Sequence, residues 1–170
     1  MNFSNISYFI LRKRILSYIL FLTFITIIVI GSSFDNLFLV APPYAVSLYL
    51  IILESKSKFS NKKNIIFSYS FLILTTEVIH VIIGIGTISL LINLILVSIF
   101  ISFSKFSHPP AIALTIFSYI EHQLTAFTID SIVIMGVVII AELVNDRIEV
   151  FQNRILDKKL LKTLKYASYK

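Results

Sequence analysis

The sequence predicts an all-α membrane protein that crosses a lipid bilayer six times. Hydrophobic residues make up 57% of the 170 residues, and the mean hydropathy is +0.91. The apolar share of a soluble globular domain is nearer half. The apolar residues also gather in runs with few charges, and one membrane-crossing helix needs only ~20 such residues. Cysteine is absent, which excludes disulfides and thiolate metal sites.

Six apolar runs follow one another along the chain, separated by short polar breaks. The first run follows the basic residues Arg12-Lys13-Arg14. It is too long for a signal peptide and lacks a small-residue cleavage site, so we interpret it as a retained anchor. Gly84-Ile85-Gly86 predicts a short turn between the third run and the fourth. The predicted membrane segments are residues 15–30, 37–53, 64–83, 87–104, 110–120 and 124–144.

Two basic flanks enclose the predicted transmembrane domain of residues 15–144. Residues 1–14 form a basic N-terminus, and residues 145–170 form a tail with seven basic and three acidic residues. Apolar residues recur in this tail at roughly helical spacing. The spacing fits either an amphipathic helix on the membrane surface or a solvated basic helix, and the sequence leaves both open.

The distribution of charge predicts the orientation of the chain. Basic residues gather at positions 12–14, 54–63, 105 and 145–170. If all six segments cross, these four places lie on the cytoplasmic side, as basic loops of membrane proteins do. The polar residues left outside are then Asp35, the Gly84–Gly86 turn and Glu121-His122. We therefore predict a multi-pass protein of the cell membrane with both termini in the cytoplasm. The net charge of +6 reflects this orientation and not a nucleic-acid partner.

The four prolines form two pairs, Pro42-Pro43 and Pro109-Pro110, which are 67 positions apart. Proline pushes the residue before it out of the α region, yet it is tolerated in the first turn of a helix. Each pair therefore predicts extended chain that turns into a helix, with helices beginning at about Pro43 and Pro110. The second and fifth segments are thus predicted to be broken into extended chain plus half-helix.

The two pairs lie at equivalent places in two similar triplets, residues 15–83 and 87–144. Each triplet has three segments, so the second must be inverted relative to the first. Inverted repeats with discontinuous helices are a recurring plan of transporters, which bind substrate near the midplane. The five residues 37–41, if extended, cover roughly 16 Å, about half of a ~30 Å hydrocarbon core. The two half-helices should therefore meet near the middle of the membrane from opposite sides.

The stretch Phe106-Ser107-His108-Pro109-Pro110-Ala111-Ile112-Ala113 resembles the signature of the HPP family of integral membrane proteins. Ala41-Pro42-Pro43 stands in place of that family's first proline-containing segment, and the resemblance covers residues 15–144. The resemblance implies a membrane transporter, usually described with four spans, with nitrite as the transported ion of photosynthetic members. We expect six segments because a hydropathy count misses broken ones.

A helix N-terminus attracts anions through its partial positive charge and its free N–H groups. Two of them facing each other, beside Lys105 and His108, predict a midplane site for a small monovalent inorganic anion. The resemblance makes nitrite the preferred candidate. The alternative is that both pairs are packing kinks, with His108 bonded to a carbonyl group. The N–H groups expected to be unpaired are those of Tyr44, Ala45, Val46, Ala111, Ile112 and Ala113. The full predicted substrate site comprises Ala41, Pro42, Pro43, Tyr44, Ala45, Val46, Lys105, Ser107, His108, Pro109, Pro110, Ala111, Ile112 and Ala113.

Three ionisable residues inside predicted segments are candidates for proton coupling, because such residues are costly in a membrane. Glu77 and His80 lie three positions apart on one helical face, and Asp130 lies within the sixth run. The alternative for the two carboxylates is a structural hydrogen bond to another segment. Glu-x-x-His is half of a di-iron pattern, but no second copy falls in a segment, so neither metal nor cofactor is predicted.

The sequence contains no nucleophile–base pair, phosphate loop or paired carboxylates, so we do not predict an enzyme. Three classes remain, namely transporter, channel and non-transporting membrane scaffold. Six short segments enclose a thin bundle, which favours a homo-oligomer.

Overall fold

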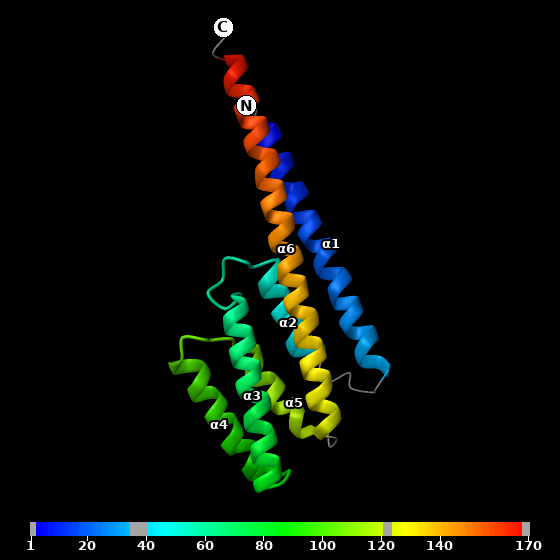
Figure 1. Ribbon diagram of the computed structural model, residues 1–170, viewed down its shortest axis with the longest axis vertical. Coiled ribbons are helices and arrows are strands. Elements are labelled where there is room, and N and C mark those ends of the chain that lie inside the picture. The colour runs from blue at the N-terminus through cyan, green and yellow to red at the C-terminus, as the bar shows by residue number, and fades with distance from the viewer. Residues whose placement is uncertain (1–2, 35–40, 121–123, 168–170) are drawn as a thin grey trace.

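A computed structural model describes residues 3–34, 41–120 and 124–167. Within these ranges the chain forms α-helices and no strand, in agreement with the predicted all-α class. Asp35, Glu121 and His122, which were predicted to lie outside the membrane, fall beyond the described ranges. The helices, shown in Figure 1, are α1 (Phe3–Phe34), α2 (Ala41–Ile52), α3 (Lys62–Ile82), α4 (Thr87–Phe103), α5 (Pro110–Ile120) and α6 (Leu124–Ala167).

Three of these helices are long and apolar enough to cross a membrane. The qualifying stretches are Leu11–Gly31 of α1, Lys62–Ile82 of α3 and Thr125–Ile155 of α6. Helix α4 has 17 residues and reaches about 26 Å. Helices α2 and α5 have 12 and 11 residues and reach only about 17–18 Å, well short of a ~30 Å hydrocarbon core.

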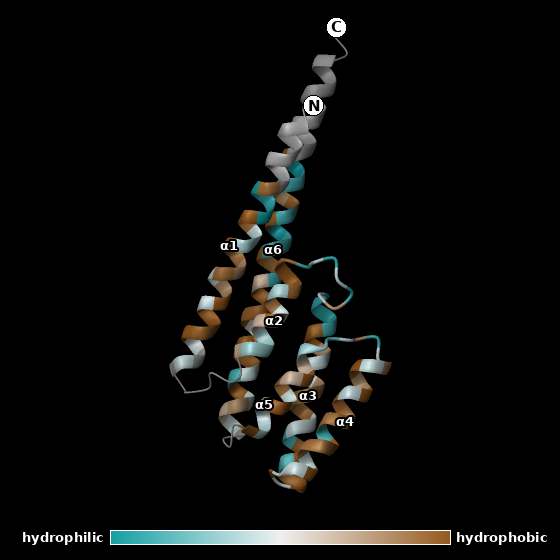
Figure 2. Cartoon of the chain, turned by 180° about the vertical axis from the view of Figure 1, so that it is seen from behind, coloured by the Kyte–Doolittle hydropathy of each residue, from teal (hydrophilic) through white to brown (hydrophobic). Residues whose placement is uncertain are grey.

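The helices carry apolar side chains on their outer surfaces, and the interior holds polar side chains as well as apolar ones. Val81 is 77% exposed and Phe103 is 85% exposed, and apolar residues cover much of the lower bundle in Figure 2. The fully buried residues, in contrast, include Ser47, Thr76 and Asn93. A water-soluble protein rarely exposes so much contiguous apolar surface. This distribution is consistent with an α-helical membrane protein, in which polar residues join the helices.

Both termini lie at the same end of the molecule, where α1 and α6 run side by side (Figure 1). Nζ of Lys13 and Oε1 of Glu149 form an ion pair of 2.7 Å that joins the two helices there. Helix α1 begins at Phe3, so the basic N-terminal flank belongs to the first helix and is not a separate segment. The α2–α3 connection lies at the upper rim of the lower bundle, on the side from which the ends of α1 and α6 project (Figure 1).

Helix α6 extends from Leu124 to Ala167 without a break, although its membrane run was predicted to end at Val144. Residues 145–167 contain neither glycine nor proline and are rich in helix formers, so nothing stops the helix at the end of the apolar run. The tail is therefore helical as far as Ala167. Its placement on a membrane surface or in water stays a prediction.

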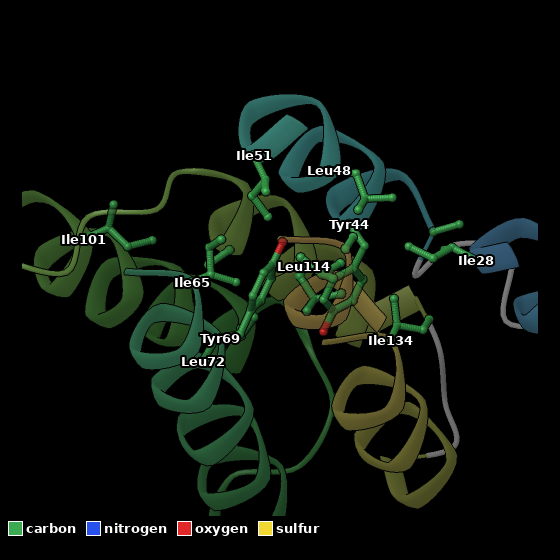
Figure 3. Packing of buried hydrophobic residues seen from close by; sticks show 14 of the residues in the cluster. Ile28, Tyr44, Leu48, Ile51, Ile65, Tyr69, Leu72, Ile101, Leu114 and Ile134 are labelled. Carbon is green, nitrogen blue, oxygen red and sulfur yellow. The ribbon is translucent and has the colours of Figure 1, made fainter. Parts of the chain in front are cut away.

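Helix α2 lies at the centre of the core. Tyr44, Leu48 and Ile51 are fully or almost fully buried and recur at helical spacing, so they form one continuous buried face. The ring of Tyr44 stacks on that of Tyr69 from α3, with centroids 4.6 Å apart (Figure 3). Helix α2 contacts α1, α5 and α6. Helix α2 has Pro42-Pro43 in its first turn, and α5 begins at Pro110. These two short helices therefore touch each other.

The starts of the two short helices differ in how well they were predicted. Helix α5 begins at Pro110, as expected. Helix α2 begins at Ala41, two residues before the predicted start at Pro43. Both prolines of α2 fit in its first turn because the N–H groups of that turn have no intrahelical acceptor to lose. Residues 37–40, the rest of the predicted extended stretch, lie outside the described ranges.

Candidate functional site

His108 lies in the connection between α4 and α5 and is fully buried. Its Nδ1 is 2.9 Å from the carbonyl oxygen of Phe59, in the α2–α3 connection. Its Nε2 is 2.8 Å from Oγ of Ser47, in the second turn of α2. The residue before one Pro-Pro pair is thus bonded to the helix that carries the other pair.

The chain before His108 is held in place by serine side chains. Ser104 ends α4, and its Oγ accepts a hydrogen bond of 3.1 Å from the N–H of Phe106, a local turn typical of serine. The hydroxyl of Ser68 on α3 donates to the carbonyl oxygen of Phe106. The ring of Phe106 stacks on Phe67 with centroids 4.2 Å apart. These contacts fix the direction from which His108 enters the core.

Ser47, Tyr69 and His108 form a buried hydrogen-bonded chain, the His108 network. Oη of Tyr69 is 2.6 Å from Oγ of Ser47 and 3.3 Å from the carbonyl oxygen of Pro43, and its single hydrogen is directed at the nearer Ser47 oxygen. A carbonyl oxygen only accepts, so Nδ1 of His108 donates to Phe59. Nε2 then accepts from the Ser47 hydroxyl, which accepts from Tyr69. Every member of the network is satisfied when the imidazole is neutral.

The same positions also accommodate a charged imidazole. If Nε2 carries a proton, it donates to Oγ of Ser47. The Ser47 hydroxyl then donates to the carbonyl oxygen of Pro43, 3.0 Å away. Only the hydroxyl hydrogen has to rotate. No carboxylate is among the hydrogen-bond partners of His108, and a buried charge without a counter-charge is costly. The neutral ring is therefore the form that this structure favours.

The N–H groups predicted to be unpaired at α5 have partners within the chain. The N–H of Ala111 donates to the carbonyl oxygen of His108 at 3.1 Å, and that of Ile112 donates to Pro109 at 3.0 Å. The prediction was wrong for these two groups because the chain already turns at His108, two residues before α5 begins at Pro110. Ala111 is also fully buried, which leaves no open space at its backbone.

Because α2 begins at Ala41, Tyr44 is the last of its first four positions, and Ala45 and Val46 lie beyond them. The positions of that first turn include Pro42 and Pro43, which have no N–H to offer. What remains at both helix N-termini is the helix dipole, with few backbone donors.

The predicted substrate-site residues divide by burial. Pro42, Val46, Lys105 and Pro109 are exposed, so Lys105 does not share the buried position of His108. Ser107, Ala45, Ile112 and Ala113 are half-buried. The structure buries Ala41, Pro43, Tyr44, His108, Pro110 and Ala111. Within this last set, Pro43 and His108 are joined through Ser47.

The three predicted proton-coupling residues lie in different surroundings. The hydroxyl of Thr128 on α6 donates to Oε1 of Glu77, which gives this carboxylate a structural bond to another helix. Asp130 is half-buried on α6. His80 is 8% exposed, and its ring meets that of Tyr119 edge-on with centroids 4.3 Å apart. Neither ring nitrogen of His80 has a hydrogen-bond partner among the described residues.

His80 belongs to a second buried polar group, the His80 cluster, formed with Thr76, Asn93 and Tyr119. Nδ2 of Asn93 donates to Oγ1 of Thr76 at 2.9 Å. Oδ1 of Asn93 and the Tyr119 hydroxyl have no partner of normal geometry in the described part of the chain, although Ser89 and Asn93 face that hydroxyl. Each such buried group costs about 1–3 kcal/mol.

Asn93 and Tyr119 were missed from the sequence. Asn93 could have been found from the sequence, because its amide lies in the middle of the otherwise apolar fourth run. Such a polar group is costly in a membrane unless it is hydrogen-bonded. In the described ranges, no three His, Asp or Glu side chains gather to hold a metal ion.

No family model, curated protein or solved structure matches the chain. The similarity of residues 106–113 to the HPP signature therefore stays a prediction.

Proposed function

We propose that this chain is a multi-pass membrane transporter of a small monovalent inorganic anion, with nitrite as the first candidate. The observation that carries the proposal is the buried contact of 2.8 Å between Ser47 of α2 and His108 before α5. It joins two helices that are each too short to cross a bilayer. Short helices that begin beside each other in a buried polar centre are the arrangement found in transporters with broken helices.

The proposed topology has six segments in two inverted repeats, α1–α3 and α4–α6. It is supported by the positions of the basic chain ends, which lie together in Figure 1. Lys56 of the α2–α3 connection lines the same cavity as Lys13 and Arg14 of α1. The positive-inside rule assigns this end to the cytoplasm. The Gly84–Gly86 turn, where Gly84 has a φ of 86°, then lies outside.

The proposed site is the His108 network. We propose that the anion replaces the Ser47–His108 hydrogen bond and receives a bond from each of the two groups. The imidazole must then be protonated at Nε2, and the anion supplies the counter-charge that the buried ring lacks. A hydrogen bond to a charged group contributes about 1.5–3 kcal/mol, compared with about 0.5–1.5 kcal/mol for a neutral one. One proton would accordingly enter with each anion.

The His80 cluster and Glu77 and Asp130 are the proposed proton pathway of this transporter. His80 supports the proposal best, because its ring nitrogens are buried and have no partner in the described chain. Glu77 is the weakest member, since Thr128 already donates to it.

A non-transporting scaffold is the second candidate, and one specific observation favours it. Both ring nitrogens of His108 are satisfied, and the N–H groups of Ala111 and Ile112 are bonded within the chain. A channel is the third candidate and needs the same site.

Reconstituted vesicles distinguish the three functions. We expect saturable, pH-dependent uptake of at least one anion from a panel of nitrite, nitrate, formate, chloride and bicarbonate. Conductance that does not saturate would indicate a channel. Vesicles that move none of the five anions would overturn the transport proposal in favour of the scaffold.

A further inference from the structure

A cavity of about 830 Å³ lies between α1, the C-terminal end of α2 with its following connection, and α6. Its walls include residues 11–19 of α1 and residues 145–152 of α6. Its volume falls in the range of sites for small ligands. It is separate from the His108 network and the His80 cluster, since none of the residues of those two groups lines it.

The cavity lining carries a surplus of positive charge. Lys13 and Glu149 neutralise each other across the α1–α6 contact, at 2.7 Å. Arg14 and Lys56 also line the cavity, and neither forms an ion pair with any residue in the described ranges. Glu54 is the remaining acidic residue of the lining. Two unpaired cations therefore face one unpaired carboxylate.

The cavity also lies at the boundary between the charged and apolar parts of α1. Its lining passes from Arg14 to the apolar residues Ile15 and Ile19 within two turns. Figure 2 shows this boundary as a change from hydrophilic to hydrophobic colouring along the helices. Tyr18 and Tyr49 line the cavity and are 52% and 45% exposed. Half-exposed tyrosines are typical of the level of the lipid headgroups.

We infer that this cavity binds the phosphate-bearing headgroup of an anionic phospholipid. Arg14 and Lys56 contact the phosphate, and the first part of an acyl chain lies along Ile15 and Ile19. A free phosphate ion would contact the two cations but would leave the apolar wall of the cavity exposed to water. A phospholipid contacts both the cations and the apolar wall. Basic pockets between membrane helices near the cytoplasmic surface are suited to such headgroups. The inference needs only that the chain sits in a membrane and is independent of anion transport.

The test measures lipid retention by the purified full-length chain in detergent. Phosphatidylglycerol and phosphatidylcholine with identical acyl chains are added in equal amounts, and native mass spectrometry counts the lipid that stays bound. We expect phosphatidylglycerol to be retained in preference by about 25-fold, which corresponds to about 2 kcal/mol for the two basic residues. Equal retention of the two lipids would overturn the inference.

Variants locate the retained lipid. Arg14→Gln and Lys56→Gln should each reduce the preference by about fivefold, whereas Glu54→Gln should increase it. The matched controls are Arg12→Gln, two positions away on α1, and Lys58→Gln in the same connection, because neither residue lines the cavity. If the control variants lose as much preference as the two cavity variants, the lipid binds by general surface charge and the cavity assignment is wrong.

A soluble competitor separates the two sources of a phosphate group. Glycerol phosphate has the headgroup chemistry without the acyl chains, and it should leave the bound phosphatidylglycerol in place at equal concentration. Displacement at equal concentration would show a site for free phosphate esters and would contradict the lipid assignment.

Discussion

Oγ of Ser47 and Nε2 of His108 lie 2.8 Å apart in a buried hydrogen bond, although the two residues are 61 positions apart in the chain. The bond joins α2 to the connection that leads into α5. Because Nδ1 of His108 also bonds to the carbonyl oxygen of Phe59, one imidazole links three parts of the fold. This network stabilises the fold, and it is also the proposed ion site. The two roles can be measured separately.

The structural contribution of the network can be measured with Tyr69→Phe. This variant removes the hydroxyl that bonds to Ser47 and leaves the ring in place, so we expect a loss of about 0.5–1.5 kcal/mol in the free energy of unfolding. Tyr49→Phe is the matched control, because its ring is 45% exposed on α2 and belongs to no buried network. Unfolding is followed by circular dichroism in mixed micelles. Equal stability of the two variants would mean that the Tyr69 hydroxyl is not part of the network.

The proposed topology predicts which sides of the membrane two connections face. Single cysteines can be placed freely because the chain has none of its own. Lys58→Cys, in the α2–α3 connection, should react with an impermeant maleimide only from the cytoplasmic side. Ile85→Cys, in the turn before α4, should react only from outside. If position 58 is labelled from outside, the α2 segment does not cross, and the inverted-repeat arrangement fails.

The proposed proton pathway predicts the effect of His80→Gln. Glutamine keeps a hydrogen-bonding group at this position but cannot carry a proton at neutral pH, so the pH dependence of anion uptake should become flat. Exchange of labelled for unlabelled anion should continue, because it requires no net proton movement. Glu77→Gln and Asp130→Asn are measured in the same way, and a wild-type pH profile in any variant removes that residue from the pathway.

The positions of the helices were largely predictable from the sequence, because charge, glycine and proline mark the ends of the apolar runs. The predicted starts at Thr87, Pro110 and Leu124 agree with α4, α5 and α6. The start of α2 was placed too late, since proline excludes the helix interior but not the first turn. The sixth apolar run ends at Val144, whereas α6 continues to Ala167, because hydropathy marks the extent of the apolar run and not the end of the helix.

The partners within the site could not be predicted in the same way. Periodicity shows which face of a helix is buried, but it does not show which helix that face meets. His108 was selected from its motif, whereas Ser47 and Tyr69 became visible as its partners only once α2 and α3 were packed together. The same reason hid the meeting of His80 with Tyr119 and of Tyr119 with Asn93.

The most direct test of the central claim is nitrite uptake into vesicles reconstituted with the wild-type chain, with His108→Ala and with the control Tyr49→Phe. Size-exclusion chromatography first establishes that each variant is folded. We predict that His108→Ala reduces uptake at least tenfold, equivalent to about 1.4 kcal/mol, because the anion loses the proton-bearing donor that also balances its charge. Tyr49→Phe should transport as the wild type does. Wild-type uptake by folded His108→Ala would contradict the account, since the buried imidazole would then hold the helices together without touching the ion.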